Sequence, residues 1–342
     1  MRPRWEDVNA RVRGLGSHLL GQEALANLAQ SADLSTLARG LESRGVLARE
    51  IPNPTAPALE LALRRAAAHD IRVVRRWLGP RDEIVSVALD AEDRRSLRAL
   101  IRGAVAGASA EARLVGLIPT PALPERLLQE LAARVRVKEQ AALLLAAGQP
   151  YGAALLAASS EATEPDLLAL ELAVARTFAE RALRGARTGG GLLLDYVTTL
   201  IDLENCRAAL LLVKRGAGEP AGPAFIPGGR RLRQREFERA ATSPDGGAAA
   251  RVLVAALGGG SLGLVLLRHA TDPIALEAAL EAEMLAWLRH HARLDPLGPA
   301  PLLLYFQRVR AQAEALGGLV WSVDLGLPVA SRSRRVAGTT AS

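Results

Sequence analysis

A stretch near the middle of the chain, residues 200–215, recurs elsewhere in the sequence. Its apolar positions are Leu203, Cys206, Leu210 and Val213. Their spacing of three and four predicts a helix with one buried face. Residues 93–102 repeat the pattern 109 positions earlier, residues 311–316 repeat it 109 positions later in degraded form, and residues 9–14 are a looser copy. The matched polar pairs are Asp93 with Asp202, Ser96 with Asn205, and Arg98 with Arg207. Self-similarity at a fixed offset predicts an architecture built from repeated units.

The composition favours helices over strands. Hydrophobic residues make up 49% of the chain and aromatic residues only 3%. The apolar content is mostly Ala and Leu, which are strong helix formers, whereas strands prefer Val, Ile, Thr and Tyr. A chain of 342 residues is also long for one hydrophobic core. We therefore expect an all-α protein with two or three domains.

The chain carries a formal net charge of +7. A basic balance permits contact with nucleic acid, with anionic lipid or with an acidic protein partner. Arginine is spread along nearly every predicted helix and is not interleaved with aromatic residues, which favours solvated helix faces over a nucleic-acid site. A basic helical scaffold that binds nucleic acid remains the alternative from another functional class.

Two further features bear on the compartment. The single cysteine, Cys206, cannot form an internal disulfide, and its place on the apolar stripe predicts a buried thiol in a reducing compartment. The N-terminus lacks the apolar core of a signal peptide. Of two long uncharged runs, 141–160 is interrupted by Gly148-Gln-Pro150, and 252–267 is too short to cross a bilayer. The sequence predicts a soluble or peripheral protein.

A second element follows two of the helix copies. Residues 117–123 and 225–232 share an apolar residue, then Ile-Pro, then a turn that leads into a short helix. In the second of these, Gly228 and Gly229 suit a turn that needs positive φ. Its arginines are Arg230, Arg231 and Arg233. They are either part of a solvated turn or a contact with a partner, and we take them as the candidate partner-contact residues.

One motif suggests an enzyme. Gly259-Gly-Ser-Leu-Gly263 matches the Gly-x-Ser-x-Gly elbow of α/β-hydrolases, and Asp272 and His290 follow in the required order. Such an elbow needs a parallel sheet, yet nothing upstream alternates strands with helices. A serine hydrolase is therefore a remote alternative.

Other signals of a ligand are missing from the sequence. No P-loop motif occurs, and the adjacent His290 and His291 fall on different helix faces, which is unsuited to metal binding. We expect no catalytic residue, cofactor, metal or small-molecule substrate.

The polar residues of the repeated helix have a structural interpretation. Asp and Arg recur five positions apart on a helix, and such side chains tie neighbouring helices together through charge-assisted hydrogen bonds. A structural role in each copy is more economical than a separate active site in each. The residues to which we assign this role are Asp93, Arg98, Asp202, Asn205 and Arg207.

These motifs together resemble a known family. Asn9-Ala-Arg-Val-Arg-Gly-Leu-Gly-Ser-His-Leu-Leu20 is similar to the opening helix of the C subunit of A-type and bacterial V-type rotary ATPases, whose eukaryotic counterpart is the d subunit of the V-ATPase. Asp202-Leu-Glu-Asn-Cys-Arg207 resembles its Asp-x-x-Asn-Leu-Lys/Arg helix, and Ile226-Pro-Gly-Gly229 resembles the turn that follows. The resemblance runs from about residue 5 to residue 328. The sequence departs from the family where Cys206 replaces Leu, Ser96 replaces Asn and Ala311 replaces an acid.

The resemblance implies an all-helical funnel of three similar domains with pseudo-threefold symmetry, and the internal repeat agrees with three units. We expect a first domain over residues 1–115 completed by 302–328, a second over 116–222 and a third over 223–328. The Ser/Thr-rich basic tail, 329–342, is expected to be disordered.

The resemblance also implies a function. It predicts a non-catalytic central-stalk subunit, peripheral on the cytoplasmic face of the membrane. Its partners would be the central shaft subunits and the membrane proteolipid ring, with no nucleic acid bound. The protein would couple the shaft to the ring for proton or sodium transport.

Overall fold

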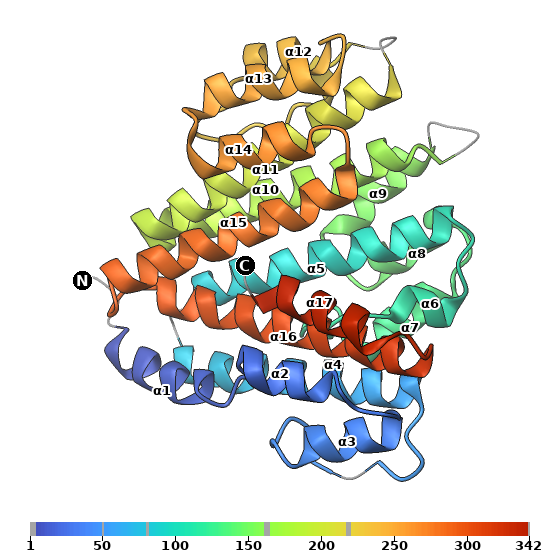
Figure 1. The fold of residues 1–342 in the computed structure, drawn as a ribbon. Helices are drawn as coiled ribbons and strands as arrows, with labels where there is room; N and C mark the ends of the chain where they lie inside the picture. The colour runs from blue at the N-terminus through green and yellow to red at the C-terminus, as the bar shows by residue number, and fades with distance from the viewer. Residues whose placement is uncertain (1–4, 50, 80–81, 161–164, 217–219, 341–342) are drawn as a thin grey trace. The chain divides into compact units, whose positions relative to one another are not determined.

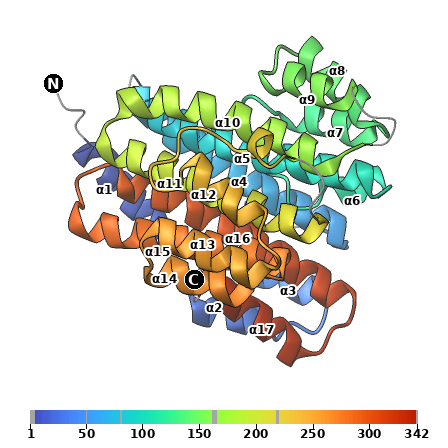
Figure 2. The same ribbon diagram turned by 90° about the horizontal axis from the view of Figure 1, so that it is seen from above.

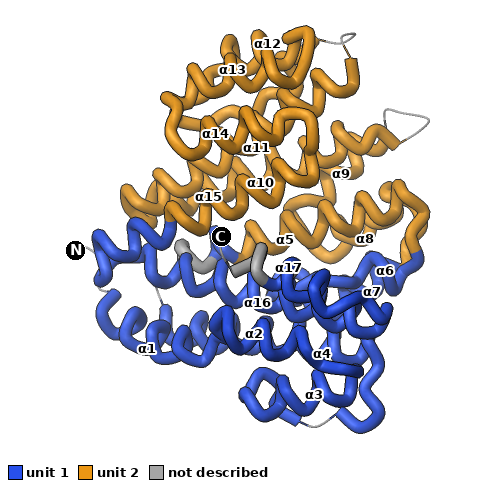
Figure 3. The backbone as a smooth tube through the Cα atoms, in the orientation of Figure 1, with its two compact units in different colours: residues 1–88, 109–132, 288–342 blue, residues 89–108, 133–287 orange. Residues whose placement is uncertain are grey.

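The computed structural model describes residues 5–49, 51–79, 82–160, 165–216 and 220–340 (Figure 1). Regular structure in these ranges is helical throughout, without a strand, which confirms the all-α class. The chain divides into two compact units (Figure 3). Unit 1 comprises residues 1–88, 109–132 and 288–342, and unit 2 comprises residues 89–108 and 133–287.

Unit 1 combines helices from the two ends of the chain. Its helices are α1 (Glu6–Gly16), α2 (Gln22–Leu28), α3 (Leu34–Glu42), α4 (Ala56–Leu78), α6 (Ala110–Leu114), α7 (Glu125–Ala133), α16 (Ala300–Asp324) and α17 (Val329–Thr340). Helix α16 packs against α1 and α4. Residues 302–328 therefore lie in the same unit as the N-terminal helices.

The core of unit 1 follows from the apolar stripe of α4. Leu59, Leu63, Ile71 and Leu78 are buried at helical spacing, while the opposite face of α4 is exposed. The core is completed by leucines of α2 and α3 and by Leu316, Leu319 and Val320 of α16. Helix α3 starts where the Asp33 side chain accepts a hydrogen bond from the Thr36 N–H, at 2.7 Å.

Unit 2 is built on a pair of long helices. Its helices are α8 (Val137–Ala146), α9 (Tyr151–Ser160), α10 (Leu167–Gly189), α11 (Gly191–Arg215), a short 3-10 helix (Gly222–Ala224), α12 (Gln234–Ala241), α13 (Gly246–Leu257) and α14 (Gly260–His269). Helices α10 and α11 lie side by side (Figure 2), and α12 and α13 pack against α11. Two further long helices, α5 (Asp82–Val105) and α15 (Pro273–Leu294), have residues in both units, and the last residue of α7, Ala133, is assigned to unit 2.

The prediction of a disordered tail over residues 329–342 is wrong for its described part. Residues Val329–Thr340 form α17. Arg332 donates hydrogen bonds to the carbonyl oxygens of Ser31 and Leu327, at 2.7 and 2.6 Å, and Val336 is buried in the core of unit 1. Arg332 and Val336 are four positions apart, so one helical face makes both contacts. Residues 341–342 lie outside the described part.

Two other predictions concern the large-scale organisation. No helix of the described residues is long and apolar enough to cross a membrane. The interrupted run 141–160 indeed forms two short helices, α8 and α9, which end and begin around Gly148-Gln-Pro150. The division into three similar domains, 1–115 with 302–328, 116–222 and 223–328, stays a prediction.

Candidate functional site: a buried arginine–glutamate centre and a clamped turn

Two copies of the repeated helix contribute to unit 2. One lies in the second half of α5 and the other in α11. The matching arginines, Arg98 and Arg207, are both buried, at 5% exposure each. Buried arginine is rare unless the guanidinium is paired, so each of these side chains must have acidic partners.

The two arginines share their partners. Arg207 donates to Glu171 of α10 at 2.8 Å, and Arg98 approaches the same carboxylate at 3.4 Å. Glu204 of α11 accepts from Arg207 at 3.1 Å through one oxygen and from Arg98 at 3.3 Å through the other. Repeat-related positions therefore meet at one pair of carboxylates.

Further charged side chains extend this cluster. Arg94 pairs with Glu204, and Arg102 pairs with Glu171. Glu277 of α15 forms an ion pair with Arg98 at 2.9 Å. We call the whole set the Arg/Glu centre; its members are Arg94, Arg98, Arg102, Arg207, Glu171, Glu204 and Glu277. It joins α5, α10, α11 and α15 within unit 2.

The electrostatics of the centre keep Glu171 and Glu204 ionised. Burial acts to raise the pKa of Glu171, but hydrogen bonding from Arg102 and the charges of Arg207 and Arg98 outweigh it and lower the pKa to about 2. Burial likewise opposes ionisation of Glu204, yet the surrounding arginines hold its pKa well below the usual range. Carboxylates with such low pKa values do not exchange protons near neutrality, so the centre is a structural tie and not an acid–base site.

The other repeated residues of α11 hold the turn that follows. Asn205 donates its amide to the Ile226 carbonyl at 2.8 Å and accepts from the Ile226 N–H at 2.8 Å. The Asp202 carboxylate accepts from the backbone N–H groups of Arg230, Arg231 and Leu232, at 3.2, 2.9 and 3.1 Å. These bonds satisfy buried and partly buried backbone groups of residues 226–232, which we call the clamped turn.

The two glycines of the clamped turn are required for different reasons. Gly228 has φ +106°, in the region that side chains other than glycine rarely adopt. A Cβ on Gly229 would collide with Oδ1 of Asp202. The positive φ expected for a turn at Gly228 and Gly229 is found at Gly228 alone, whereas Gly229 lacks a positive φ and allows a close approach to Asp202.

The candidate partner-contact residues are exposed on this turn. Arg230 pairs with Asp195 at 2.6 Å, and both side chains are largely in solvent. Arg231 donates to the Leu257 carbonyl at 3.2 Å. Arg233 is exposed at the start of α12. The clamp fixes the backbone at Arg230 and Arg231, so these two side chains project from a rigid base.

The copies of the repeated helix in α1 and α5 differ in how far they reproduce the contacts of Asp202 and Asn205. Asn9 in α1 donates its amide to the Gly298 carbonyl at 2.8 Å and so holds the loop before α16, as Asn205 holds its turn. Asp93 is buried in α5. Ser96, which matches Asn205, is also buried, but its hydroxyl has no hydrogen-bond partner in the described part of the chain. Ser96 therefore does not reproduce the pair of backbone hydrogen bonds that Asn205 makes.

The hydrolase motif does not form an elbow. Gly259 precedes helix α14, and Ser261 lies in its first turn. The residues before it form helix α13 and not a strand. The Ser261 hydroxyl donates to Glu283 of α15 at 2.6 Å. A nucleophile elbow needs a strand that leads into the turn, so this geometry offers no support for a nucleophilic serine.

Comparison with known proteins decides the family. The family model described as ATP synthase (C/AC39) subunit matches residues 8–326. The C subunit of the A-type ATP synthase of Haloferax volcanii is 28% identical to the chain over 336 residues, which cover 94% of each protein. The chain belongs to the ATP synthase (C/AC39) subunit family. The resemblance inferred from the sequence motifs is thus confirmed.

Membership of the C/AC39 family settles two predictions. The chain is a subunit of the rotary ATPase type and is not itself an enzyme. The expected structural ties by Arg98, Asp202, Asn205 and Arg207 have the contacts described above.

Sequence reasoning missed the acidic half of the Arg/Glu centre. Glu171 shares the buried face of α10 with Val174 and Phe178, so an acid stands at a core position of an apolar stripe. Glu204 precedes Arg207 by three positions on the repeated helix itself. For Glu171 the signal is an acid at a core position of an apolar stripe, because a buried carboxylate requires a cation nearby. For Glu204 the signal is its spacing of three from Arg207.

Proposed function

We propose that the chain is the central-stalk subunit that couples the rotor shaft of its rotary ATPase to the membrane proteolipid ring, for proton or sodium transport. In this role it is peripheral, on the cytoplasmic face of the membrane. Its partners are the shaft subunits on one side and the ring on the other.

The family match over residues 8–326 carries this proposal. The rigidity of unit 2 supports it. Transfer of torque requires a body that does not yield between its contacts, and the Arg/Glu centre ties α5, α10 and α11 by charge-assisted hydrogen bonds that are shielded from solvent. A clamped turn with exposed arginines then offers a stiff site for an acidic partner.

The partner contact is assigned to Arg230, Arg231 and Arg233. Their charge complements acidic loops on a shaft or ring, and such complementarity accelerates docking more than it tightens the complex. Arg230 already binds a carboxylate, Asp195, in an exposed pair. A carboxylate of the partner would exchange with Asp195 at little cost, because exposed ion pairs contribute little stability.

The test is deletion of the whole chain from its host, followed by measurement of ATP hydrolysis and ion pumping in isolated membranes. We expect hydrolysis without pumping, restored by the wild-type chain and equally by a Ser261→Ala chain. Pumping that stays coupled without the chain refutes the proposal. Tagged chain purified from the same membranes should carry the shaft and ring subunits, whereas salt-sensitive binding to duplex DNA would favour the nucleic-acid scaffold instead.

A further inference from the structure

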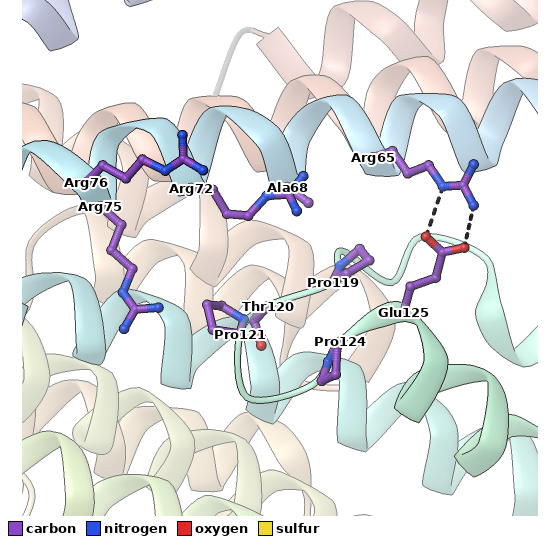
Figure 4. Close-up of a pocket in the computed structure, with 10 residues that line it drawn as sticks. All are labelled: Arg65, Ala68, Arg72, Arg75, Arg76, Pro119, Thr120, Pro121, Pro124 and Glu125. Atoms are coloured by element: carbon purple, nitrogen blue, oxygen red, sulfur yellow. Dashed lines mark hydrogen bonds and ion pairs between the residues drawn. The ribbon is translucent and has the colours of Figure 1, made fainter.

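Unit 1 contains a groove that the coupling role does not use. It has a volume of about 570 Å³ and lies between α4 and the loop that leads into α7 (Figure 4). Arg65, Arg72, Arg75 and Arg76 of α4 form one side of it. Pro119, Pro121 and Pro124 lie on the other side. We call this the α4 groove.

The loop side of the groove is held in place from beneath. The Gly116 N–H donates to Glu60 of α4 at 2.7 Å, and Glu60 pairs with Arg64 at 2.9 Å. Glu60 and Arg64 are both buried. Proline in addition fixes φ and lacks an N–H, so the proline side presents rigid apolar rings. The groove is therefore preformed and does not depend on a ligand.

The arginines of the groove form a row along the exposed face of α4. Arg65, Arg72 and Arg76 are seven and four positions apart, which places them on one face. At about 1.5 Å per residue the row extends over roughly 16 Å. Neither Arg72 nor Arg76 forms an ion pair or hydrogen bond with another of the described residues, and both are exposed.

One end of the groove already holds a carboxylate. Glu125, at the start of α7, accepts two hydrogen bonds from Arg65, at 2.9 and 2.7 Å (Figure 4). This is the bidentate geometry in which guanidinium binds carboxylate most strongly. The hydrogen bond from Arg65 lowers the pKa of Glu125, so the acid is ionised near neutrality. Arg72 and Arg76 continue the row beyond Glu125 with no carboxylate of their own among the described residues.

We propose that the α4 groove binds an acidic segment of another subunit of the complex, whose carboxylates pair with Arg72 and Arg76 as Glu125 pairs with Arg65. The apolar parts of the segment lie against the three prolines. This contact is separate from the one assigned to the clamped turn, which belongs to unit 2.

The distribution of the arginines along α4 favours an extended acidic segment over a compact phosphate group as the ligand. A phosphate group is bound most strongly where several guanidinium groups converge on one point, whereas these arginines are distributed along a helix. An extended segment gains about 3.3 Å per residue, so five residues span the row. The described residues that line the groove include no aromatic ring, so nucleic-acid bases have no stacking platform there.

The test uses a fluorescein-labelled Glu-rich peptide as the probe and the full-length chain as the receptor, with fluorescence anisotropy as the readout. We expect binding that weakens with salt, because the arginines are exposed. Arg72→Glu/Arg76→Glu should weaken binding at least about tenfold, since it replaces two attractions by repulsions. Arg72→Gln/Arg76→Gln, which only removes charge, should have a smaller effect in the same direction.

The matched control is Arg39→Glu/Arg44→Glu, which makes the same change of charge at exposed positions elsewhere in unit 1. It should bind the peptide as the wild type does, and circular dichroism checks the folding of every variant. Equal losses in the two Glu variants, or no binding to the wild type, overturn the proposal. Displacement of the peptide by inorganic diphosphate or single-stranded DNA more readily than by unlabelled peptide also overturns it, in favour of a phosphate-binding groove.

A second measurement uses the assembled complex. Residues 65–76 and 119–125 should exchange amide hydrogens more slowly in the complex than in the isolated chain, and Arg72→Glu/Arg76→Glu should remove that protection. Protection that is unchanged in the variant overturns the proposal. The outcome is independent of coupling, because a chain that fails to couple ATP hydrolysis to pumping can still bind the segment.

Discussion

Arg98 and Arg207, which stand 109 positions apart at matching places of a repeated helix, donate to the same two carboxylates, Glu171 and Glu204. The repeat therefore does more than produce similar helices. It places two positively charged side chains close together in the interior of unit 2. The two shared carboxylates offset the repulsion between these arginines. Burial lowers the pKa of Arg98, and Arg207 adds to that effect, whereas Glu204 and Glu277 oppose it.

Because the two arginines share their carboxylates, substitution of one of these arginines should strongly destabilise the fold. Arg207→Met should lower the free energy of unfolding by about 3–5 kcal/mol, because Glu171 and Glu204 lose a buried cation that pairs with both of them. Urea denaturation followed by circular dichroism measures the change. The control is Arg126→Met, which removes the exposed pair of Arg126 with Glu130 and should cost less than about 1 kcal/mol. Similar losses in the two variants would show that burial does not set the strength of these pairs.

The sharing itself makes a separate prediction. Arg98→Met/Arg207→Met should destabilise by more than the sum of the single changes, by about 0.5–3 kcal/mol, because each arginine partly compensates the carboxylates when the other is lost. A double-mutant cycle on the free energy of unfolding measures this coupling. Additive losses would mean that Arg98 and Arg207 act on Glu171 and Glu204 independently.

The pH dependence of stability follows from Glu171. Its pKa is lowered from 4.5 to about 2 in the folded chain, so its stabilising contribution is complete above about pH 4.5 and is lost as the pH falls toward 2. The full shift corresponds to about 3 kcal/mol. Glu171→Gln resembles the protonated acid, so the stability difference from wild type should be largest near neutrality and shrink in this window. A difference that stays constant down to pH 3, measured by urea denaturation at each pH, would contradict the assignment.

How far the sequence predicts this structure depends on whether a feature is local. Helical spacing and breaks such as Gly148-Gln-Pro150 identify most helices, because the apolar periodicity of a helix can be recognised within a short stretch of sequence. The tail is the exception. Arg332 and Val336 stabilise α17 through contacts with unit 1 residues roughly 300 positions away in the sequence, which composition alone does not reveal.

The residues of the site likewise fall into those that the sequence predicts and those that only the fold reveals. The repeat identified Asp202, Asn205 and Arg207 as structural residues, and the structure supplies their partners. Glu171 and Glu277 stand outside the repeat, so no match within the sequence points to them. The arginines of α4 read as a solvated helix face, and only the fold places the three prolines opposite them.

The close packing of the clamped turn against α11 predicts that even a small substitution at Gly229 destabilises the chain. Gly229→Ala should destabilise the chain by about 1–3 kcal/mol, because the added methyl displaces Asp202 from buried N–H groups. Gly14→Ala is the control, since a Cβ there meets nothing within 4 Å and the residue lies within helix α1. It should be neutral or stabilise by up to about 1 kcal/mol. Thermal unfolding of the two variants measures both effects, and a neutral Gly229→Ala would show that the turn can shift away from α11.

Substitution of the exposed arginines of the same turn should affect assembly much more than stability. Arg230→Glu/Arg231→Glu removes the exposed pair with Asp195 and one hydrogen bond to the Leu257 carbonyl, so helical content should be unchanged and stability should fall by about 1 kcal/mol. Association with the remaining subunits should slow by about tenfold or more at low salt and approach the wild-type rate at high salt, as screening removes the repulsion.

Surface-plasmon measurements of the purified chain on a complex that lacks it give the association rate at each salt concentration. Arg251→Glu/Arg268→Glu makes the same change of charge at exposed residues of α13 and α14 in unit 2. If the two variants slow association equally, net charge and not the clamped turn controls docking. If only Arg230→Glu/Arg231→Glu does so, the turn is a contact whose rigid base, set by Asp202 and Asn205, orients the arginines before the partner arrives.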